Sequence, residues 1–245
     1  MKSIDITIAT CQESAIYGDI KKSLEIIKKT VIWAEKKKVD ILCFPECFLQ
    51  GYILNETKAR KESLDFGSNK FQDILQIIDN SSTTVILGVI EKDGNHLYNT
   101  AVVIEDGKLI GKYRKQYLLN KEIFFTGGNS NPVFEKNGIK FGINICSDTR
   151  YPNSCEKLAK KGAKILFFPL NNSLPHLIAN KWKDKHRQYW INRAKENLCW
   201  VVTADVVEES QTNTGYGFTM VINPDGKVLK FLGHLKAGVL KYKIT

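Results

Sequence analysis

Apolar residues recur at two different spacings along the chain, and segments of the two kinds alternate. Residues 4–8 place isoleucine at every second position, which predicts a half-buried strand. Between residues 20 and 34 apolar side chains return at steps of four and three, the spacing of one helix face, with Asp19 as the expected N-cap. The chain therefore begins with a strand followed by a helix.

The next apolar run, residues 41–44, stops at Pro45, so a short buried strand is expected to end directly before Glu46. A hairpin is expected around Asp106 and Gly107, which supply the backbone freedom of a tight turn. The remaining predicted helices cover residues 71–78, 155–159 and 181–197. The remaining predicted strands cover residues 85–89, 97–105, 108–113, 141–145, 165–168, 200–204 and 239–242, with a second hairpin around 223–226.

Strands and helices alternate without an internal repeat, a low-complexity tract or a linker. This organisation predicts one α/β domain over residues 1–245 with a mixed sheet. The first residues contain no continuous apolar stretch of signal-peptide or membrane-spanning length. A soluble, cytoplasmic protein without a membrane partner is therefore expected.

The formal net charge of +10 raises the possibility of nucleic-acid binding. The lysines, however, occur in small groups on the polar sides of predicted helices, and no nucleic-acid-binding module is recognisable. Solvated helix faces explain them better, and no nucleic-acid partner is expected. Six cysteines are present, four of them in or beside apolar runs, which favours reduced, buried thiols over disulfides.

Three polar residues follow predicted strands and are candidates for chemistry. Cys146 ends a buried strand where a turn into a helix would expose its thiol to backbone N–H groups. Glu46 must reach solvent or sit in a shielded cleft, where it would be a proton acceptor. Lys115 lies in a basic run. Each has a structural alternative: a core thiol, an exposed loop carboxylate and a solvated charge cluster.

Considered together, the contexts of these residues resemble the carbon–nitrogen hydrolase, or nitrilase, superfamily in order and spacing. The resembling catalytic segments are Phe44-Pro45-Glu46, Tyr113-Arg114-Lys115 followed by Leu118, and residues 142–152 around Cys146. Further similar segments are Gly51-Tyr52, Asn99-Thr100-Ala101, 193–197 and 216–226. The resemblance covers nearly the whole chain.

The resemblance implies a four-layer α-β-β-α sandwich and a homodimer or larger homo-oligomer. It also implies a mechanism. Glu46 would take the thiol proton, and Cys146 would attack the carbonyl carbon of a small linear amide or carbamoyl compound. Ammonia would then depart, and water would hydrolyse the acyl-thioester that remains on Cys146. Lys115 and the backbone N–H of Ser147 would stabilise the oxyanion. No cofactor or metal is expected, because the cysteines and histidines lack zinc-ligand spacing.

Family members often use a second glutamate after the lysine. Glu122 is the candidate here, although its register is shifted by one position and a surface role is the alternative. Tyr117 and Ser147 depart from the usual family residues. Nitrile hydrolysis by the same three residues and a catalytically silent binding protein are the competing functions.

The residues that shape the substrate pocket are harder to assign from sequence. The candidates that follow strand ends near the resembling segments are Tyr52, Asn171, Asn172 and Phe218. The two asparagines have an alternative role as turn-capping residues.

Overall fold

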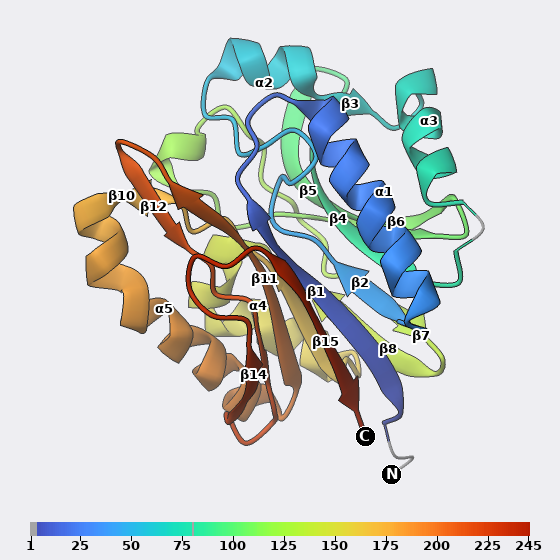
Figure 1. Ribbon diagram of the computed structural model, residues 1–245, viewed down its shortest axis with the longest axis vertical. Helices are drawn as coiled ribbons and strands as arrows, with labels where there is room; N and C mark the ends of the chain where they lie inside the picture. Colours follow the sequence, from blue (N-terminus) through green and yellow to red (C-terminus); the bar gives the residue numbers. More distant parts are fainter. Residues whose placement is uncertain (1–3, 80) are drawn as a thin grey trace.

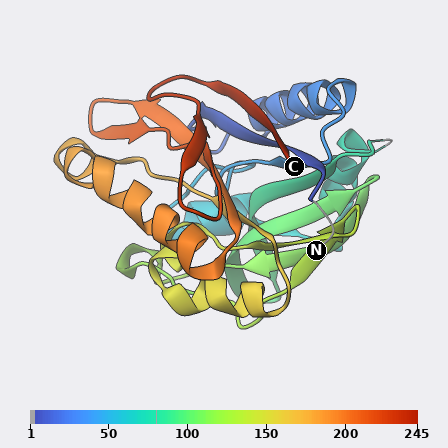
Figure 2. The ribbon, with the colours of Figure 1, turned by 90° about the horizontal axis from the view of Figure 1, so that it is seen from below.

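Two layers of strands lie face to face between two layers of helices. The computed structural model describes residues 4–79 and 81–245. Figure 1 shows α1 and α3 on one side of the strands and α4 and α5 on the other, and Figure 2 shows the layers from below. This arrangement confirms the predicted α-β-β-α sandwich.

The helices are α1 (Ile20–Lys36), α2 (Glu56–Glu62), α3 (Asn69–Ile77), α4 (Pro152–Lys160) and α5 (His176–Asn197), with short 3-10 helices η1 (Asn120–Glu122) and η2 (Cys146–Arg150). The strands are β1 (Ile6–Ser14), β2 (Ile41–Cys43), β3 (Leu64–Asp65), β4 (Thr84–Asp93), β5 (His96–Glu105), β6 (Lys108–Arg114), β7 (Val133–Lys136), β8 (Ile139–Ile143), β9 (Ile165–Pro169), β10 (Leu174–Pro175), β11 (Trp200–Glu209), β12 (Asn213–Tyr216), β13 (Met220–Ile222), β14 (Val228–Phe231) and β15 (Gly238–Ile244).

The two strand layers are joined by hydrogen bonds between β1 and β11. The strand order along the main path is β6-β5-β4-β2-β1-β11-β9-β8-β7. Strands β2, β4, β8 and β9 run parallel to a neighbour, whereas the β5–β6 hairpin is antiparallel, so the sheet is mixed as predicted. The carboxyl ends of β2 and β8, which precede Glu46 and Cys146, both belong to these parallel segments. Parallel strands have their carboxyl ends at the same edge, which brings the following loops together.

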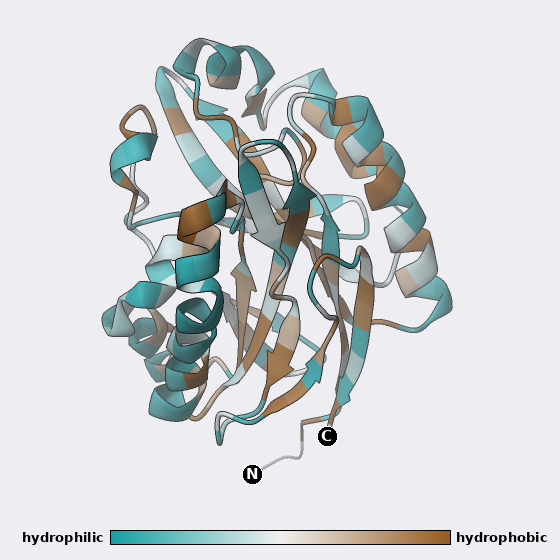
Figure 3. Ribbon diagram, turned by 60° about the vertical axis from the view of Figure 1, so that its left-hand side comes forward, coloured by the Kyte–Doolittle hydropathy of each residue, from teal (hydrophilic) through white to brown (hydrophobic). Residues whose placement is uncertain are grey.

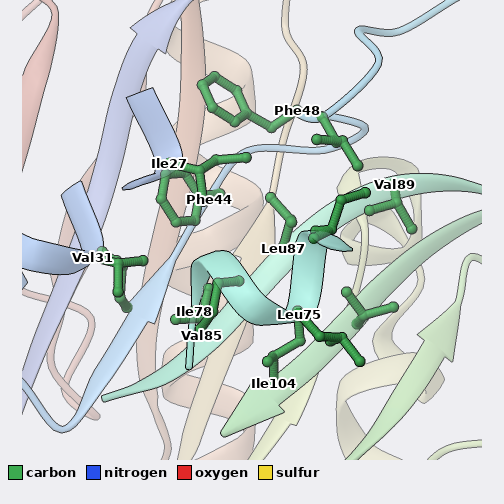
Figure 4. Packing of buried hydrophobic residues seen from close by; sticks show 14 of the residues in the cluster. Ile27, Val31, Phe44, Phe48, Leu75, Ile78, Val85, Leu87, Val89 and Ile104 are labelled. Carbon is green, nitrogen blue, oxygen red and sulfur yellow. The ribbon is translucent and has the colours of Figure 1, made fainter. Parts of the chain in front are cut away.

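Four apolar clusters form the core of the described residues, and three of them pack the layers together. The first lies under α1 and α3 and includes Ile27, Val31, Phe44, Leu75 and Leu87, whose packing Figure 4 shows. The second fills the space between the two strand layers, and the third packs β9, β11 and β13 against α4 and α5. Figure 3 shows hydrophobic segments on the central strands, whereas α5 is mostly hydrophilic in colour.

Local signals in the sequence account for several element boundaries. The Asp19 carboxylate accepts a hydrogen bond from the Lys22 N–H at 3.0 Å, so the predicted N-cap of α1 is confirmed. Asp106 and Gly107 both have positive φ (49° and 65°), as the predicted hairpin between β5 and β6 requires. All six cysteines are free thiols, which confirms the expectation of reduced cysteines.

Candidate active site

Glu46 lies in a turn packed closely against the neighbouring strand β4. A Cβ on Gly88 would come within 2.3 Å of the Pro45 carbonyl oxygen, so only glycine allows this approach. The Glu46 N–H donates to the Leu170 carbonyl at 3.1 Å, and Cys47 has a positive φ of 49°. The turn thereby directs a carboxylate that is only 1% exposed into the interior.

Lys115 is a fully buried cation placed by the loop after β6. Its N–H donates to the Asn99 carbonyl at 2.8 Å, and its own carbonyl accepts from the Gly128 N–H at 2.8 Å. Its Nζ lies 2.7 Å from Glu46 Oε1 and 2.8 Å from Glu122 Oε1. Burial alone would lower the pKa of Lys115, but the nearby Glu46, Cys146 and Glu122 outweigh it and raise that pKa above its usual range. The ammonium therefore stays charged.

Glu122 belongs to this buried cluster and not to the surface. Its side chain is fully buried in η1, where Oε1 pairs with Lys115 and Oε2 accepts from the Leu119 N–H at 2.7 Å. The shifted register relative to the family pattern thus still brings a second carboxylate to the lysine.

Asn99 is a site residue that the sequence reasoning did not single out. Its Nδ2 donates to Glu46 Oε1 at 2.7 Å, and it also lies 3.4 Å from Glu122 Oε1. The available signal was a polar residue within the apolar run of β5, in the segment Asn99-Thr100-Ala101 that resembles the family. Two donors, Asn99 and Lys115, therefore hold the same oxygen of Glu46.

The other oxygen of Glu46 is different, since Oε2 has no hydrogen-bond partner among the described residues although it is buried. A buried carboxylate oxygen without a donor is costly in an ordinary core and is frequent where a proton must be accepted. Glu46 is thus fixed through Oε1 and has Oε2 available for chemistry.

Cys146 is the first residue of η2, separated from the end of β8 by two residues, and has a positive φ of 42°. A non-glycine residue held in this region carries backbone strain of the kind that accumulates at functional sites. Burial raises the pKa of the Cys146 thiol, and the Glu46 charge raises it further, whereas Lys115 and a backbone hydrogen bond from Asn171 lower it. The resting thiol therefore keeps its proton and needs a base.

Asp148 ties the lysine loop to the nucleophile turn. Its Oδ1 accepts from the N–H groups of Gln116 (3.1 Å) and Tyr117 (2.8 Å), and its Oδ2 accepts from the Ile145 N–H (2.9 Å) and the Tyr113 hydroxyl (2.8 Å). Burial raises the pKa of Asp148 to about 6, against the lowering effect of these donors. One carboxylate thus fixes the segments on both sides of the candidate site.

Replacing Asp148 by asparagine is expected to change the pH dependence of stability. The folded pKa of about 6 lies above 3.8, the ordinary value of an aspartate side chain, so ionisation of Asp148 opposes folding between these pH values. The parent therefore loses up to about 3 kcal/mol as pH rises from about 4 to about 6, at roughly 1.4 kcal/mol per pKa unit, and the variant does not. Urea unfolding of both proteins across this range measures the difference. A destabilisation by Asp148→Asn that is the same at every pH would contradict this assignment.

Tyr117 and Ser147, the two departures from the family pattern, contact each other. The Ser147 hydroxyl donates to the Tyr117 carbonyl, and the Tyr117 ring stacks on Tyr151 with centroids 3.8 Å apart. Both departures therefore belong to one local contact beside η2.

The predicted pocket residues are divided between two cavities. Tyr52 and Asn171 line a cavity of about 450 Å³, whereas Asn172 and Cys146 line a much smaller one of about 10 Å³ beside α5. Phe218 lines neither cavity. It is buried in an aromatic cluster, with its ring centroid 5.7 Å from that of Trp190, so the structure does not bring it to the pocket.

Both asparagines also stabilise the turn in which they lie, which was the alternative to lining the pocket. Asn172 donates from its backbone N–H and its Nδ2 to the buried carboxylate of Asp205, at 3.0 and 2.9 Å. The Asn171 side chain accepts from the Ser173 N–H at 3.4 Å. Turn stabilisation and cavity lining therefore coexist in this segment.

Comparisons with known proteins agree with this architecture. Residues 7–245 match the family model described as carbon-nitrogen hydrolase. A 2-oxoglutaramate amidase of Bacillus subtilis is 30% identical over 97% of this chain and 90% of its own length. A nitrilase of Pyrococcus abyssi is 31% identical over 85% of this chain and 78% of its own.

Solved structures show the same fold at lower identity. Nit3 of Saccharomyces cerevisiae, a nitrilase-superfamily member, superposes with a TM-score of 0.86 at 22% identity, covering 98% of this chain and 90% of its own. An amidase from Nesterenkonia AN1 has a TM-score of 0.85 at 20% identity, covering 98% and 92%. Since the family model matches almost the whole length of the chain, this protein belongs to the carbon–nitrogen hydrolase family.

Proposed function

We propose that this protein is an amidase that releases ammonia from a small linear amide or carbamoyl compound through an acyl-thioester on Cys146. The observation that carries the proposal is the arrangement of Glu46. Its Oε1 is held by Lys115 and Asn99, and its buried Oε2 is unpartnered. The Cys146 thiol, whose pKa is raised, supplies the proton that such a base would accept.

In the first half-reaction Glu46 takes the proton of the Cys146 thiol as the sulfur attacks the amide carbonyl carbon. The C=O π pair moves to oxygen, and the resulting oxyanion would be stabilised by the Lys115 ammonium and the Ser147 N–H. Glu46 then returns the proton to the amide nitrogen. The C–N bond breaks, ammonia leaves, and the thioester remains.

In the second half-reaction Glu46 takes a proton from water, whose oxygen attacks the thioester carbonyl. Collapse of the second tetrahedral intermediate breaks the C–S bond, the carboxylic acid leaves and the thiol is restored. Glu122 forms a second ion pair with Lys115, and we assign to Glu122 the role of orienting this lysine.

The Cys146→Ala variant is expected to lose ammonia release by at least about a thousandfold, because covalent catalysis has no substitute nucleophile at this position. The assay is ammonia production from a panel of ω-amides and N-carbamoyl compounds. Cys199→Ala is the matched control, because Cys199 is a buried thiol outside the site and its loss is expected to leave the rate within about twofold.

Two results would contradict the assignment. The first is a Cys146→Ala variant as active as the parent. The second is equal modification of the parent and the variant by mild iodoacetamide treatment, measured by intact mass, since the other five cysteines are buried.

Nitrile hydrolysis through a thioimidate is the second candidate, because one relative at 31% identity is named a nitrilase. Adding nitriles to the same panel separates it from amide hydrolysis. A silent binding protein would hydrolyse neither class.

The homodimer and the cytoplasmic location stay predictions. Within residues 4–79 and 81–245, none of the helices combines the length and the apolar character needed to cross a bilayer.

A further inference from the structure

The cavity of about 450 Å³ carries side chains of both charges. Its lining includes Lys121 and Glu208, together with the polar residues Tyr17, Ser173 and Asn213. A volume of this size suits a small metabolite. A singly charged substrate would leave one of the two charges without a counterpart, and a purely apolar substrate would leave both.

Two contacts connect this cavity with the candidate catalytic residues. Tyr52 lines it, and the Tyr52 ring lies 5.7 Å from Lys115 Nζ and 5.0 Å from Lys121 Nζ. Asn171 also lines it, and the Asn171 backbone N–H lowers the pKa of the Cys146 thiol. A substrate with its amide at Cys146 would therefore reach this cavity beside Tyr52 and Asn171.

Lys121 is an available cation at the Tyr52 side. Among the ion pairs of the described residues, none involves Lys121, whereas its neighbour Glu122 pairs with Lys115 through Oε1 and accepts from the Leu119 N–H through Oε2. The aromatic face of Tyr52 favours an ammonium at this distance. Lys121 is thus positioned to meet a substrate carboxylate.

Glu208 is a pre-oriented anion at the end of β11. Its Oε2 accepts hydrogen bonds from the Tyr17 hydroxyl at 2.7 Å and the Ser173 hydroxyl at 2.6 Å. No hydrogen bond or ion pair within the described part of the chain involves Oε1. One oxygen therefore fixes the carboxylate, and the other is free to accept from a ligand.

We propose that this cavity recognises the α-ammonium and α-carboxylate of an amino-acid ω-amide, with Glu208 binding the ammonium and Lys121 the carboxylate. The inference rests on the proposed amidase function and narrows its substrate class. Since Lys121 and Glu208 do not pair with each other, a zwitterion satisfies both charges at once. Charge-assisted hydrogen bonds of this kind are about twice as strong as neutral ones, so each contact favours the zwitterion over analogues that lack one charge.

The test compares L-glutamine and L-asparagine with their deaminated counterparts glutaramate and succinamate. The parent is expected to have at least about tenfold higher kcat/KM for the amino-acid amides. Glu208→Gln should lower kcat/KM for these amino-acid amides by about ten- to hundredfold. Its effect on kcat/KM for the deaminated amides should be at least about tenfold smaller. Its new amide still accepts from Tyr17 and Ser173, which preserves the local structure.

The remaining variants separate the two charges. Lys121→Gln is expected to lower kcat/KM for every amide that carries a carboxylate, and to have less effect on γ-aminobutyramide, which lacks it. Glu209→Gln is the matched control, because it removes the same charge from the neighbouring residue, which is exposed and does not line this cavity. The kcat/KM of this variant should stay within about twofold of the parent value.

Equal loss by Glu208→Gln on amino-acid and deaminated amides would overturn the inference, as would a parent that prefers the deaminated amides. A binding measurement keeps this outcome separate from failure of the proposed reaction. Calorimetric titration of L-glutamine and L-asparagine into the Cys146→Ala protein, with and without Glu208→Gln, tests recognition alone. Glu208-dependent binding without turnover in the parent would reject the reaction and support the cavity assignment, and absence of binding would reject the cavity assignment.

Discussion

Glu46→Gln is expected to lower kcat by about a hundred- to ten-thousandfold, the range lost when a positioned general base is removed. The amide oxygen of the variant can still accept from Lys115 and Asn99, as Glu46 Oε1 does. The amide nitrogen takes the place of Oε2, which has no partner to lose. The variant should therefore fold normally and lack only the proton acceptor.

Single-turnover measurements of ammonia release give the size of this effect, and urea unfolding checks that the fold is intact. Glu156→Gln is a matched control on α4, because its carboxylate is exposed and, within residues 4–79 and 81–245, forms an ion pair with Lys160 alone. A Glu46→Gln protein with a kcat within tenfold of the parent would remove Glu46 from the role of base.

Lys115→Met is expected to destabilise the protein by about 3–5 kcal/mol at neutral pH, in addition to impairing the reaction. Methionine fills most of the volume, but Glu46 and Glu122 are then buried without their shared cation. Breaking a buried ion pair from one side has this cost because an uncompensated charge stays behind.

The cause can be separated from a packing defect by a second substitution. If stranded carboxylates are responsible, removing the charge of Glu122 in the double variant Lys115→Met/Glu122→Gln should recover part of the lost stability, measured by urea unfolding. Lys160→Met is the control, since its ion pair with Glu156 is largely exposed and is worth at most about 1 kcal/mol. A double variant that is no more stable than Lys115→Met would favour lost packing.

Periodic and local signals predicted most of the fold. The N-cap Asp19 and the turn at Asp106-Gly107 depend on neighbouring residues alone, so the sequence reasoning located them correctly. Helix α2 was missed because its only buried residue is Ala59, and one apolar position defines no face. Short strands such as β3, β10 and β12 were missed for a related reason, since they are too short for an alternating pattern to emerge.

The order of the family-like segments predicted that Glu46, Lys115 and Cys146 would come together. In the structure Lys115 Nζ pairs with Glu46 Oε1, and the charges of both side chains act on the Cys146 thiol. What the sequence left open depends on contacts between distant segments. The burial of Glu122 and the contact of Asn99 with Glu46 join residues from different loops and strands. The expectation for Phe218 came from its place after a strand, but the direction of its side chain is set by Trp190 and other aromatic neighbours on α5 and β12.

The shared lysine has a consequence for what the site admits and releases. Two carboxylates, one ammonium and a protonated thiol give the buried cluster of Glu46, Glu122, Lys115 and Cys146 one excess negative charge. Moving the thiol proton to Glu46 leaves that sum unchanged, so the chemical step requires no counter-ion to enter. An uncharged amide meets no repulsion at this end, whereas the carboxylate formed by hydrolysis does. The excess negative charge of this cluster, which includes the base that activates Cys146, would thus also favour release of the carboxylate product.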